Sequence, residues 1–527
     1  MEPKGRKLLI VLLVVLIIIG IGDLLMPKII NVSDLGQSKL DYVVNLINSQ
    51  YVDDVNIDSL QDAAIRSFLE DLDPHSVYIT AEEIAKENEQ LRGNFDGIGV
   101  QFRIIEDTIV VVQPIAQGPS HKAGIMPGDR IIEVNDSVVC GKGITNEDVF
   151  KLLKGKKGTK VKLGIKRHNI EKNLQFTVKR DAIPIYSVDY SGMIDSSIGY
   201  IKLSQFSANS YQEVHESLIK LKEQGMKQLI FDLRGNGGGY LDQAISIVDE
   251  FLPKDDLIVF TKGRAKGRQD YFATSKGEFE NGKVIVLIDE ISASAAEIVS
   301  GALQDNDRGL IIGRRTFGKG LVQEQKELID GSVVRLTVSR YYTPSGRCIQ
   351  RPYTLGDTEK YYTDFIERYT NMENNTDTIS HADSLKYKTK KGRAVYGGGG
   401  IEPDIELSYN LYKKSESYTN LLKKGLIYKF CFDYLDKHRT DFAKYENGED
   451  FLNGFEISQH FYQHMITFAN GQDVQVNTLT NDEVKEIKLL MKSYLAQNLY
   501  GEEYFYKIYL EIDEDIKKSL PYFQKNK

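Results

Sequence analysis

Two residues near the middle of this 527-residue chain could together carry out nucleophilic catalysis. Ser294 lies in the run Ser292-Ala293-Ser294-Ala295-Ala296-Glu297, and Lys319 lies in Thr316-Phe317-Gly318-Lys319-Gly320. A serine attacks a carbonyl carbon once a neighbouring base takes its proton. A lysine can be that base if burial lowers its pKa from ~10.4 towards ~7–8. The alternative is a serine that caps a helix and a lysine in solvent, and the spacing alone does not decide between them.

The residues around Ser294 predict a strand followed by a helix. Val284 to Ile288 is an unbroken apolar run, which is typical of a strand buried on both faces, and Ile298 to Leu303 has a helical pattern. Ser294 lies between them among residues too small to cover its hydroxyl, and the N–H of Ala295 follows at once. We therefore expect Ser294 at the carboxyl edge of a buried sheet.

A glycine-rich turn is expected at the same edge of the sheet. Ile198 to Phe206 and Gln228 to Leu233 read as strands, with a helix between them from Tyr211 to Leu221. The second strand runs into Asp232-Leu233-Arg234-Gly235-Asn236-Gly237-Gly238-Gly239. Its N–H groups could bind a phosphate or the oxyanion of a tetrahedral intermediate. Because no GK[ST] follows, a nucleotide P-loop is not indicated.

Taken together, these motifs closely resemble the core of the C-terminal processing peptidases, also called tail-specific proteases. The resemblance rests on three segments: Ser292 to Ile298, Gly301 to Asn306 and Thr316 to Gln323. It implies that Ser294 is the nucleophile, that Lys319 is the general base and that Gln323 orients the lysine. The family often has a third serine where this chain has Ala296, and this departure leaves the dyad intact.

The resemblance also implies the oxyanion hole and the fold. The donors would be the N–H of Ala295 and that of Gly238 or Gly239, with the choice between the two glycines open. The implied fold class is α/β (α+β multidomain): a crotonase/ClpP-like peptidase core of ββα units with an inserted PDZ domain, an N-terminal helical segment and a C-terminal helical domain. The implied mechanism needs no metal or other cofactor. Three cysteines, Cys140, Cys348 and Cys431, lie far apart and indicate neither a zinc site nor a disulfide framework.

A second module precedes the core and resembles a PDZ domain. Gly97-Ile98-Gly99-Val100 resembles its carboxylate-binding loop, where backbone N–H groups face the terminal carboxylate of a peptide that pairs with the next strand. The run from Ala123 to Asn135, AGIMPGDRIIEVN, is a specific PDZ signal. Asn146 to Leu153 is expected to be a helix and Lys160 to Lys166 a closing strand.

The N-terminus predicts a membrane anchor. Three basic residues within the first seven precede the apolar run from Leu8 to Gly22, and no A-x-A cleavage site follows. We expect an uncleaved signal anchor rather than a removed signal peptide, with the first residues cytoplasmic. The protein would then belong to the cell envelope, held in the inner (plasma) membrane with its catalytic domain on the periplasmic or extracytoplasmic side.

The length of the chain predicts several domains, because single cores stop growing at ~250–300 residues. The expected regions are a signal anchor at 1–30, an N-terminal helical segment at 31–93, the PDZ domain at 94–180, the peptidase core at 181–408 and a C-terminal helical domain at 409–527. The net charge of −8 argues against a nucleic-acid partner. The polar stretch from Tyr353 to Lys391 is expected to be an exposed excursion.

Several alternatives stay open. His75, in an LDPHS element that also resembles the family, is assigned to packing or hydrogen bonding, and Asp305 to electrostatic support of the site, capping or the surface. The expected function is endoproteolysis near the exposed C-termini of protein substrates. A non-catalytic PDZ scaffold with a degenerate core would have lost Ser294 or Lys319, and a crotonase-like acyl-CoA enzyme would need neither the PDZ domain nor the export segment. A homo-oligomer and an activating adaptor protein both remain open.

Overall fold

The computed structural model describes residues 39–168, 170–373, 383–407 and 414–524. The chain divides into two compact units, residues 1–72 and residues 73–527. The expected anchor at 1–30 lies outside the described residues. A search of the described part of the chain finds no helix that is both long and apolar enough to span a membrane.

The first unit contains two helices, α2 (Lys39–Gln50) and α3 (Ile57–Glu70). Asn56 caps α3, since its side chain accepts a hydrogen bond of 3.1 Å from the N–H of Ser59. Helix α2 has no buried side chain, and α3 buries Leu69. The helical pattern that the sequence predicts for this segment is therefore present.

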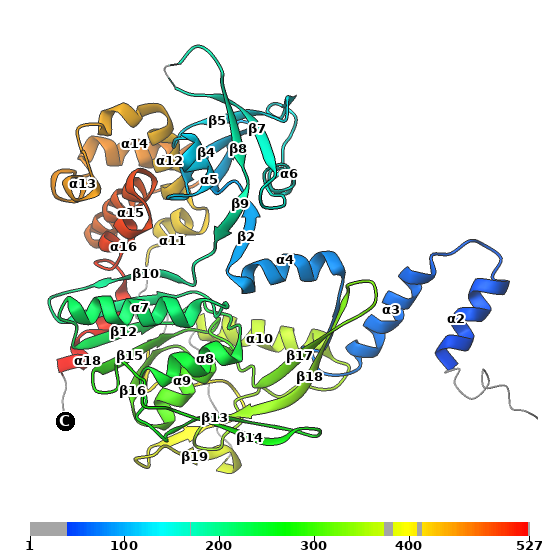
Figure 1. Cartoon of the computed structure of the whole chain (residues 1–527). Coiled ribbons are helices and arrows are strands. Elements are labelled where there is room, and N and C mark those ends of the chain that lie inside the picture. Colours follow the sequence, from blue (N-terminus) through cyan, green and yellow to red (C-terminus); the bar gives the residue numbers. More distant parts are fainter. Residues whose placement is uncertain (1–38, 169, 374–382, 408–413, 525–527) are drawn as a thin grey trace, which may run out of the picture. The chain divides into compact units, whose positions relative to one another are not determined.

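A six-stranded sheet forms the centre of the second unit (Figure 1). Its order is β10 (Val188–Met193), β11 (Ile198–Leu203), β12 (Gln228–Asp232), β15 (Lys283–Ile288), β16 (Gly309–Gly313) and β21 (Ile405–Glu406). All neighbours pair in parallel except β10, which runs antiparallel to β11. Strand β11 ends at Leu203 rather than at the expected Phe206, which instead makes an isolated bridge to the glycine-rich turn at Gly239.

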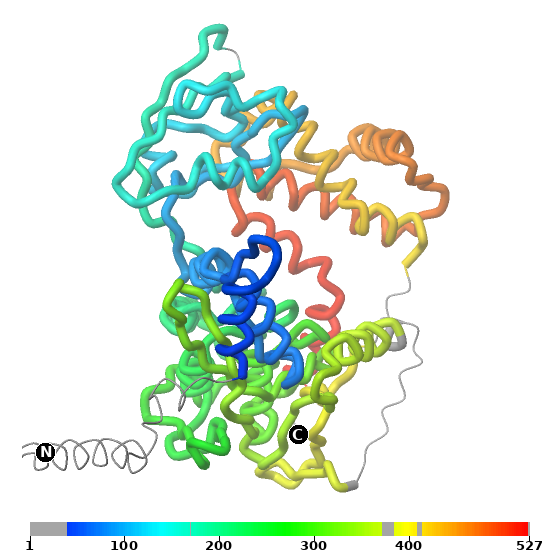
Figure 2. The backbone as a smooth tube through the Cα atoms, turned by 90° about the vertical axis from the view of Figure 1, so that its right-hand side faces the viewer, coloured from blue at the N-terminus to red at the C-terminus, as the bar shows by residue number. Residues whose placement is uncertain are grey.

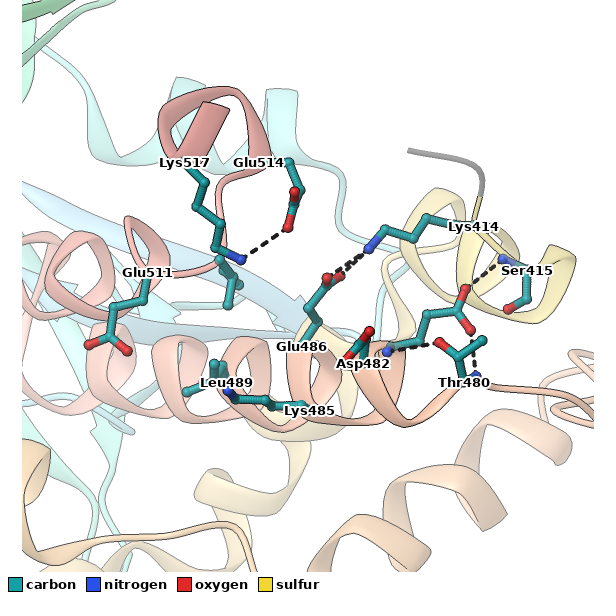
Figure 3. Close-up of a pocket in the computed structure, with 12 residues that line it drawn as sticks. Lys414, Ser415, Thr480, Asp482, Lys485, Glu486, Leu489, Glu511, Glu514 and Lys517 are labelled. Carbon is teal, nitrogen blue, oxygen red and sulfur yellow. Dashed lines mark hydrogen bonds and ion pairs between the residues drawn. The ribbon is translucent and has the colours of Figure 1, made fainter. Parts of the chain in front are cut away.

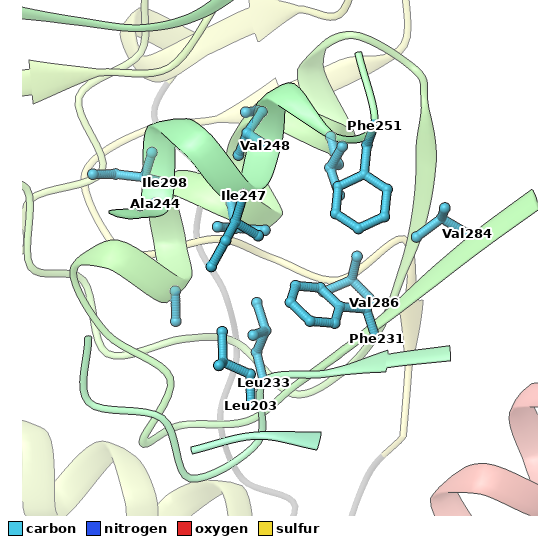
Figure 4. Close-up of a cluster of buried hydrophobic side chains, with 14 of the residues drawn as sticks. Leu203, Phe231, Leu233, Ala244, Ile247, Val248, Phe251, Val284, Val286 and Ile298 are labelled. Atoms are coloured by element: carbon cyan, nitrogen blue, oxygen red, sulfur yellow. The ribbon is translucent and has the colours of Figure 1, made fainter. Parts of the chain in front are cut away.

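Three helices cover one face of this sheet. They are α7 (Ser210–Glu223), α8 (Leu241–Asp249) and α9 (Ala295–Asp305). Figure 4 shows the cluster beneath them, in which Phe231 and Val286 of the strands lie against Ile247 and Phe251, all fully buried. Every residue of α9 is buried, so the helix that follows the candidate nucleophile is fixed by packing along its whole length.

The C-terminal end of the chain covers the other face. Helices α16 (Glu502–Tyr509), α17 (Glu514–Ser519) and α18 (Pro521–Gln524) return to the sheet, as the red segment in Figure 2 shows. Leu510, Ile516 and Phe523 pack in one cluster with strand residues that include Tyr200 and Ile230. The last residues of the expected C-terminal helical region thus complete the peptidase core.

A second sheet, which is antiparallel, follows directly on the loop that contains Lys319. It consists of β1 (Val77–Ile79), β13 (Leu257–Gly263), β14 (Gly267–Phe272), β17 (Leu321–Glu327) and β18 (Val333–Tyr342). Strand β18 pairs with both β17 and β1. Since β17 begins two residues after Lys319, pairing with β18 fixes the direction in which the lysine loop leaves the site.

The PDZ module is inserted between two paired strands, β2 (Asn94–Gly97) and β9 (Asp181–Pro184). Its sheet contains β3 (Val100–Ile105), β4 (Thr108–Pro114), β5 (Arg130–Val134), β6 (Ser137–Val138), β7 (Lys160–Lys166) and β8 (Leu174–Lys179). Helices α5 (Pro119–Ala123) and α6 (Asn146–Leu153) complete it, and α4 (Ala81–Arg92) precedes it. The bounds of α6 and β7 are those that the sequence predicts.

The remaining elements are helical or short. Helices α11 (Glu416–Lys423), α12 (Leu426–His438), α13 (Gly448–Gly454), α14 (Gln459–Asn470) and α15 (Asn481–Tyr500) share one aromatic-rich cluster. The expectation of an exposed excursion from Tyr353 to Lys391 is wrong in part, because the stretch contains helix α10 (Thr358–Glu373) and a strand, β19 (Lys386–Lys388), that pairs with β20 (Ala394–Tyr396). Tyr361 of α10 is 2% exposed, since its ring packs against His75 and Phe317.

Candidate active site

Ser294 has a strained backbone. It follows β15 and precedes α9, as the sequence predicts, and its φ of 54° and ψ of −111° are rare for a residue with a side chain. A sharp strand-to-helix turn of this kind presents a serine hydroxyl at the top of the sheet. Ser294 is also partly exposed, whereas Ala293 and Ala295 on either side are buried.

The neighbouring serine has a different task. The Ser292 hydroxyl is fully buried and donates a hydrogen bond of 2.8 Å to the carbonyl of Leu233, and it accepts one of 3.0 Å from the N–H of Asp289. These bonds tie the nucleophile loop to the start of the glycine-rich turn. Ser292 is therefore structural, and Ser294 is the serine available for chemistry.

Lys319 lies in the loop between β16 and β17, in an environment that favours its neutral form. Burial is the main cause that lowers the pKa of its ammonium group, and the positive charge of Arg335 lowers it further. The carboxylates of Glu297 and Asp73 oppose the shift. The net direction is the one that a lysine needs to act as a general base.

Glu297, which the sequence analysis did not assign to the site, holds both halves together. Its fully buried carboxylate accepts hydrogen bonds from the backbone N–H groups of Ser294 and Lys319, each of 2.8 Å and both at Oε2. Its Oε1 accepts a hydrogen bond of 2.8 Å from the N–H of Gly318 and one of 2.5 Å from the Thr316 hydroxyl. One side chain thus fixes the backbone of Ser294 relative to that of Lys319.

The sequence contains a signal for the bond from Ser294 to Glu297, but not for the bonds from the lysine loop. Glu297 stands three residues after Ser294, which is the S-x-x-E spacing of a capping box, and that spacing predicts its bond to the Ser294 backbone. The bonds to the lysine loop join residues about twenty positions apart, so local spacing could not indicate them. Burial raises the pKa of Glu297 to about 7, against the lowering effect of its four hydrogen-bond donors.

The side chains of Ser294 and Lys319 are not hydrogen-bonded to each other. Although both residues are described, no hydrogen bond joins Ser294 Oγ to Lys319 Nζ. The Gln323 amide donates a long bond of 3.4 Å to the Thr337 hydroxyl, which in turn donates 2.8 Å to Asp73. The role of Gln323 in orienting Lys319 therefore stays a prediction. Catalytic hydrogen bonds often tighten only when substrate binds.

The glycine-rich turn packs closely against Ser294. A Cβ atom on Gly238 would come within 2.8 Å of Ser294 Cβ and 3.0 Å of the Ala295 nitrogen, so only glycine fits there. The N–H of Gly238 donates 2.8 Å to Asn236 Oδ1. Of the two glycines left open by the sequence, Gly239 is thus the better candidate for an oxyanion donor beside Ala295.

The other candidate residues are structural. His75 Nε2 lies 3.3 Å from the Tyr361 hydroxyl, and burial with the nearby charge of Lys319 lowers the pKa of its imidazole to about 4. Asp305 is buried and accepts 2.8 Å from Arg347, so it braces the core rather than capping α9 at the surface. Among the described residues, no group of three or more acidic, histidine or cysteine side chains could hold a metal ion.

A separate apolar groove lies in the PDZ module between β3 and α6. Gly97, Ile98, Gly99 and Val100 line it together with apolar residues of α6. Phe102 of β3 and Phe150 of α6 meet across it edge to face, with ring centroids 5.5 Å apart, and leave a cavity of about 30 Å³. Among the described residues, strand β3 is the last strand of its sheet and pairs with β4 alone. Its other edge can accept a peptide as an added strand.

These features define a serine-type peptidase with a PDZ domain. Residues 197–360 match peptidase family S41 and residues 97–179 match the PDZ domain family. The chain belongs to the carboxy-terminal processing proteases of family S41, as its likeness to curated members shows. It is 37% identical over 337 residues to the carboxy-terminal processing protease CtpA of Bacillus subtilis, covering 64% of this chain and 71% of that protein.

The chain is also similar to a second curated protein and to a solved structure. A probable CtpA-like serine protease of Staphylococcus epidermidis is 36% identical over 329 residues, which is 61% of this chain and 66% of that protein. The solved structure of the photosystem II D1 C-terminal processing protease is 25% identical, covers 72% of this chain and 89% of its own, and has a TM-score of 0.37. Residues 417–501 match a family of unknown function, DUF8443.

Proposed function

We propose that this chain is a membrane-anchored serine endopeptidase that cuts protein substrates near their C-termini, with Ser294 as nucleophile and Lys319 as general base. The observation that carries the proposal is the shared anchor: the backbones of Ser294 and Lys319 both donate to one buried carboxylate oxygen of Glu297. The strained backbone of Ser294 and the lowered pKa of Lys319 support the proposal, in which substrate binding would bring the two side chains into hydrogen-bond contact.

The chemical steps follow from these groups. Neutral Lys319 takes the proton of Ser294 while the serine oxygen attacks the peptide carbonyl carbon. The N–H of Ala295 and that of Gly239 stabilise the resulting oxyanion. The C–N bond then breaks and the departing amine takes the proton from Lys319. Water, deprotonated by the same lysine, then attacks the acyl carbon. The bond from that carbon to Ser294 Oγ breaks, the serine oxygen takes the proton back from Lys319, and the acyl group leaves as a carboxylic acid.

The PDZ groove would select the substrate. A peptide tail would add to the outer edge of β3, its carboxylate received by the backbone from Gly97 to Val100 and its last side chain placed among the apolar residues of α6. Because the Phe102–Phe150 contact spans the groove, a tail must part these two rings as it enters. Residues 1–30 would anchor the enzyme with the peptidase outside the cytoplasm.

The test compares full-length wild type in detergent with Ser294→Ala and Lys319→Ala on an unfolded protein such as casein. Cleavage by the wild type, unaffected by a chelator and absent from both folded variants, is the expected result. Cleavage by Ser294→Ala at the wild-type rate would contradict the proposal. A matched pair of peptides, one with a free C-terminus and one amidated, tests the PDZ role, since the free acid should be cut faster.

A further inference from the structure

We infer that Asp513 and Asp515, at the start of helix α17, position the active site by fixing two arginines that lead into it. Arg234 begins the glycine-rich turn after β12, and Arg314 begins the segment that runs from β16 to Lys319. The inference rests on the proposed function, because it concerns the geometry of the same site. The two aspartates act through the arginines and do not touch the substrate.

The two arginines are joined to the two aspartates by well-formed hydrogen bonds. Arg234 meets Asp513 in a two-pronged pair, with Nη1 donating 3.1 Å to Oδ1 and Nη2 donating 2.8 Å to Oδ2. Asp515 Oδ2 lies 3.0 Å from Arg234 Nη1 and 3.3 Å from Arg314 Nη1. One carboxylate of α17 therefore links the chain that enters the oxyanion turn with the chain that enters the lysine loop.

The network is shielded from solvent. Asp513 is 6% exposed and Asp515 is 7% exposed, while the side chain of Arg234 is 16% exposed. Beneath them lies the fully buried Asp232, whose carboxylate accepts hydrogen bonds from Arg234, Lys202 and the Tyr200 hydroxyl. Burial by itself would raise the pKa of Asp232. The positive charges of Arg234 and Lys202 outweigh it and hold that pKa well below its usual range. Loss of one partner from such a buried pair leaves an uncompensated charge, which is costly.

Arg234 begins a turn whose other anchors all come from the core. The N–H of Gly235 donates 2.9 Å to Asp289, and the carbonyl of Asn236 accepts 2.9 Å from the N–H of Ala293, next to the nucleophile. The first residue of the turn is thus held both by Asp232 of β12 and by the C-terminal end of the chain, and the next two residues are bonded to the loop that contains Ser294. A shift of Arg234 would pass through the turn to the oxyanion donors.

Helix α17 is seated firmly enough to hold this position. Ile516 is fully buried and Phe523 is 3% exposed against the outer face of the core sheet, and the Phe523 carbonyl accepts 2.7 Å from Lys283 of β15. Asp513 also caps its own helix, since Oδ1 accepts 3.1 Å from the N–H of Ile516.

The residue between the two aspartates faces elsewhere and supplies a control. Glu514 pairs with Lys517 at 3.0 Å. Both line an open cavity of about 670 Å³ among charged side chains that include Glu486 of α15 and Glu511, as Figure 3 shows. A change at Glu514 alters the same short helix and removes the same type of charge without touching Arg234 or Arg314.

The experiment compares full-length wild type, the double variant Asp513→Asn/Asp515→Asn and the control Glu514→Gln. Two quantities are measured: kcat and KM on a peptide substrate, and amide hydrogen exchange in residues 234–239. In the double variant we expect exchange in the turn to rise about tenfold and kcat to fall about 10- to 100-fold, because small displacements of oxyanion donors are costly to rate, with KM within about threefold. The control should match wild type in both.

The outcomes separate the inference from the proposed function. Exchange in the turn and kcat within about twofold of wild type in the double variant would overturn the inference, as would a fall in kcat without faster exchange. If the double variant fails to fold, Asp515→Asn alone carries the same test, and Asp513→Glu should restore activity where Asp513→Asn loses it. A wild type that cleaves nothing would defeat the proposed function, and the exchange data would still decide the inference.

Discussion

Replacing Glu297 by glutamine is expected to weaken the site without abolishing it. The carboxylate has two pairs of donors, and glutamine offers one oxygen and one NH₂ group. If the oxygen occupies the Oε2 position, it keeps the bonds to Ser294 and Lys319. The NH₂ group then faces Thr316 and Gly318. The threonine hydroxyl can turn to accept, but the Gly318 N–H cannot.

This orientation of the glutamine determines how much folding free energy the variant loses. One buried donor is left without a partner, which costs about 1–3 kcal/mol of folding free energy. Glu297→Ala removes the acceptor for all four donors and should cost several times as much. Because the glutamine keeps both halves of the site anchored, we expect kcat/KM within about tenfold of wild type, whereas Glu297→Ala should lose at least about a hundredfold.

The pH dependence gives a second measure of the same change. The pKa of Glu297 is raised from 4.5 to about 7, so the folded protein holds this proton where the unfolded chain has released it. Stability should therefore fall as pH rises between these two values, by about 3 kcal/mol, and this slope should vanish in Glu297→Gln. The variant also removes a negative charge that raises the pKa of Lys319, so the rise of kcat/KM with pH should move to lower pH.

The assay is urea unfolding followed by far-UV circular dichroism, since the chain has no tryptophan, together with kcat/KM across pH. Glu250→Gln is a matched control, because Glu250 is also buried but pairs with His215 and accepts from the N–H of Glu278, outside the Glu297 bonds. The reasoning would be refuted if Glu297→Gln were as inactive and as unstable as Glu297→Ala, because the two retained bonds would then be irrelevant.

Three further changes have clear expected results. Ser292→Ala should lose about 1 kcal/mol of stability but keep its activity, whereas loss of activity equal to that of Ser294→Ala would contradict the assignment of the two serines. Gly238→Ala should cut kcat by at least about a hundredfold, because its Cβ would lie 2.8 Å from that of Ser294; an active, folded variant would show that the turn is not so close. Arg335→Gln should raise the pKa of Lys319 by removing a repelling charge, so the pH profile should shift to higher pH, and a shift to lower pH would be inconsistent with this cause.

The sequence predicted the elements that carry the chemistry because their signals are local. The apolar run of β15 and the small residues after it predict a serine at a strand-to-helix junction, and the structure has Ser294 there with a positive φ. The AGIMPGDRIIEVN run and the bounds of α6 likewise indicate the PDZ module. Each of these features is encoded within about a dozen consecutive residues.

What the sequence did not predict depends on contacts between distant residues. The link from Glu297 to the lysine loop, the burial of Tyr361 in a stretch that looked polar and exposed, and the pairing of Arg234 with Asp513 join residues that are far apart in the chain. A charged residue in a helical pattern is usually on the surface, so burial and partner are set by tertiary packing alone.

The most direct test of the central claim is to identify the residue that a fluorophosphonate probe modifies. Attack of the serine oxygen on phosphorus expels fluoride and leaves a stable phosphonate ester, which mass spectrometry can locate. The account predicts the label on Ser294 in wild type and in Ser292→Ala, none there in Ser294→Ala, and labelling at least about a hundredfold slower in Lys319→Ala. A label on another residue, or a Lys319→Ala variant that reacts as fast as wild type, would contradict it.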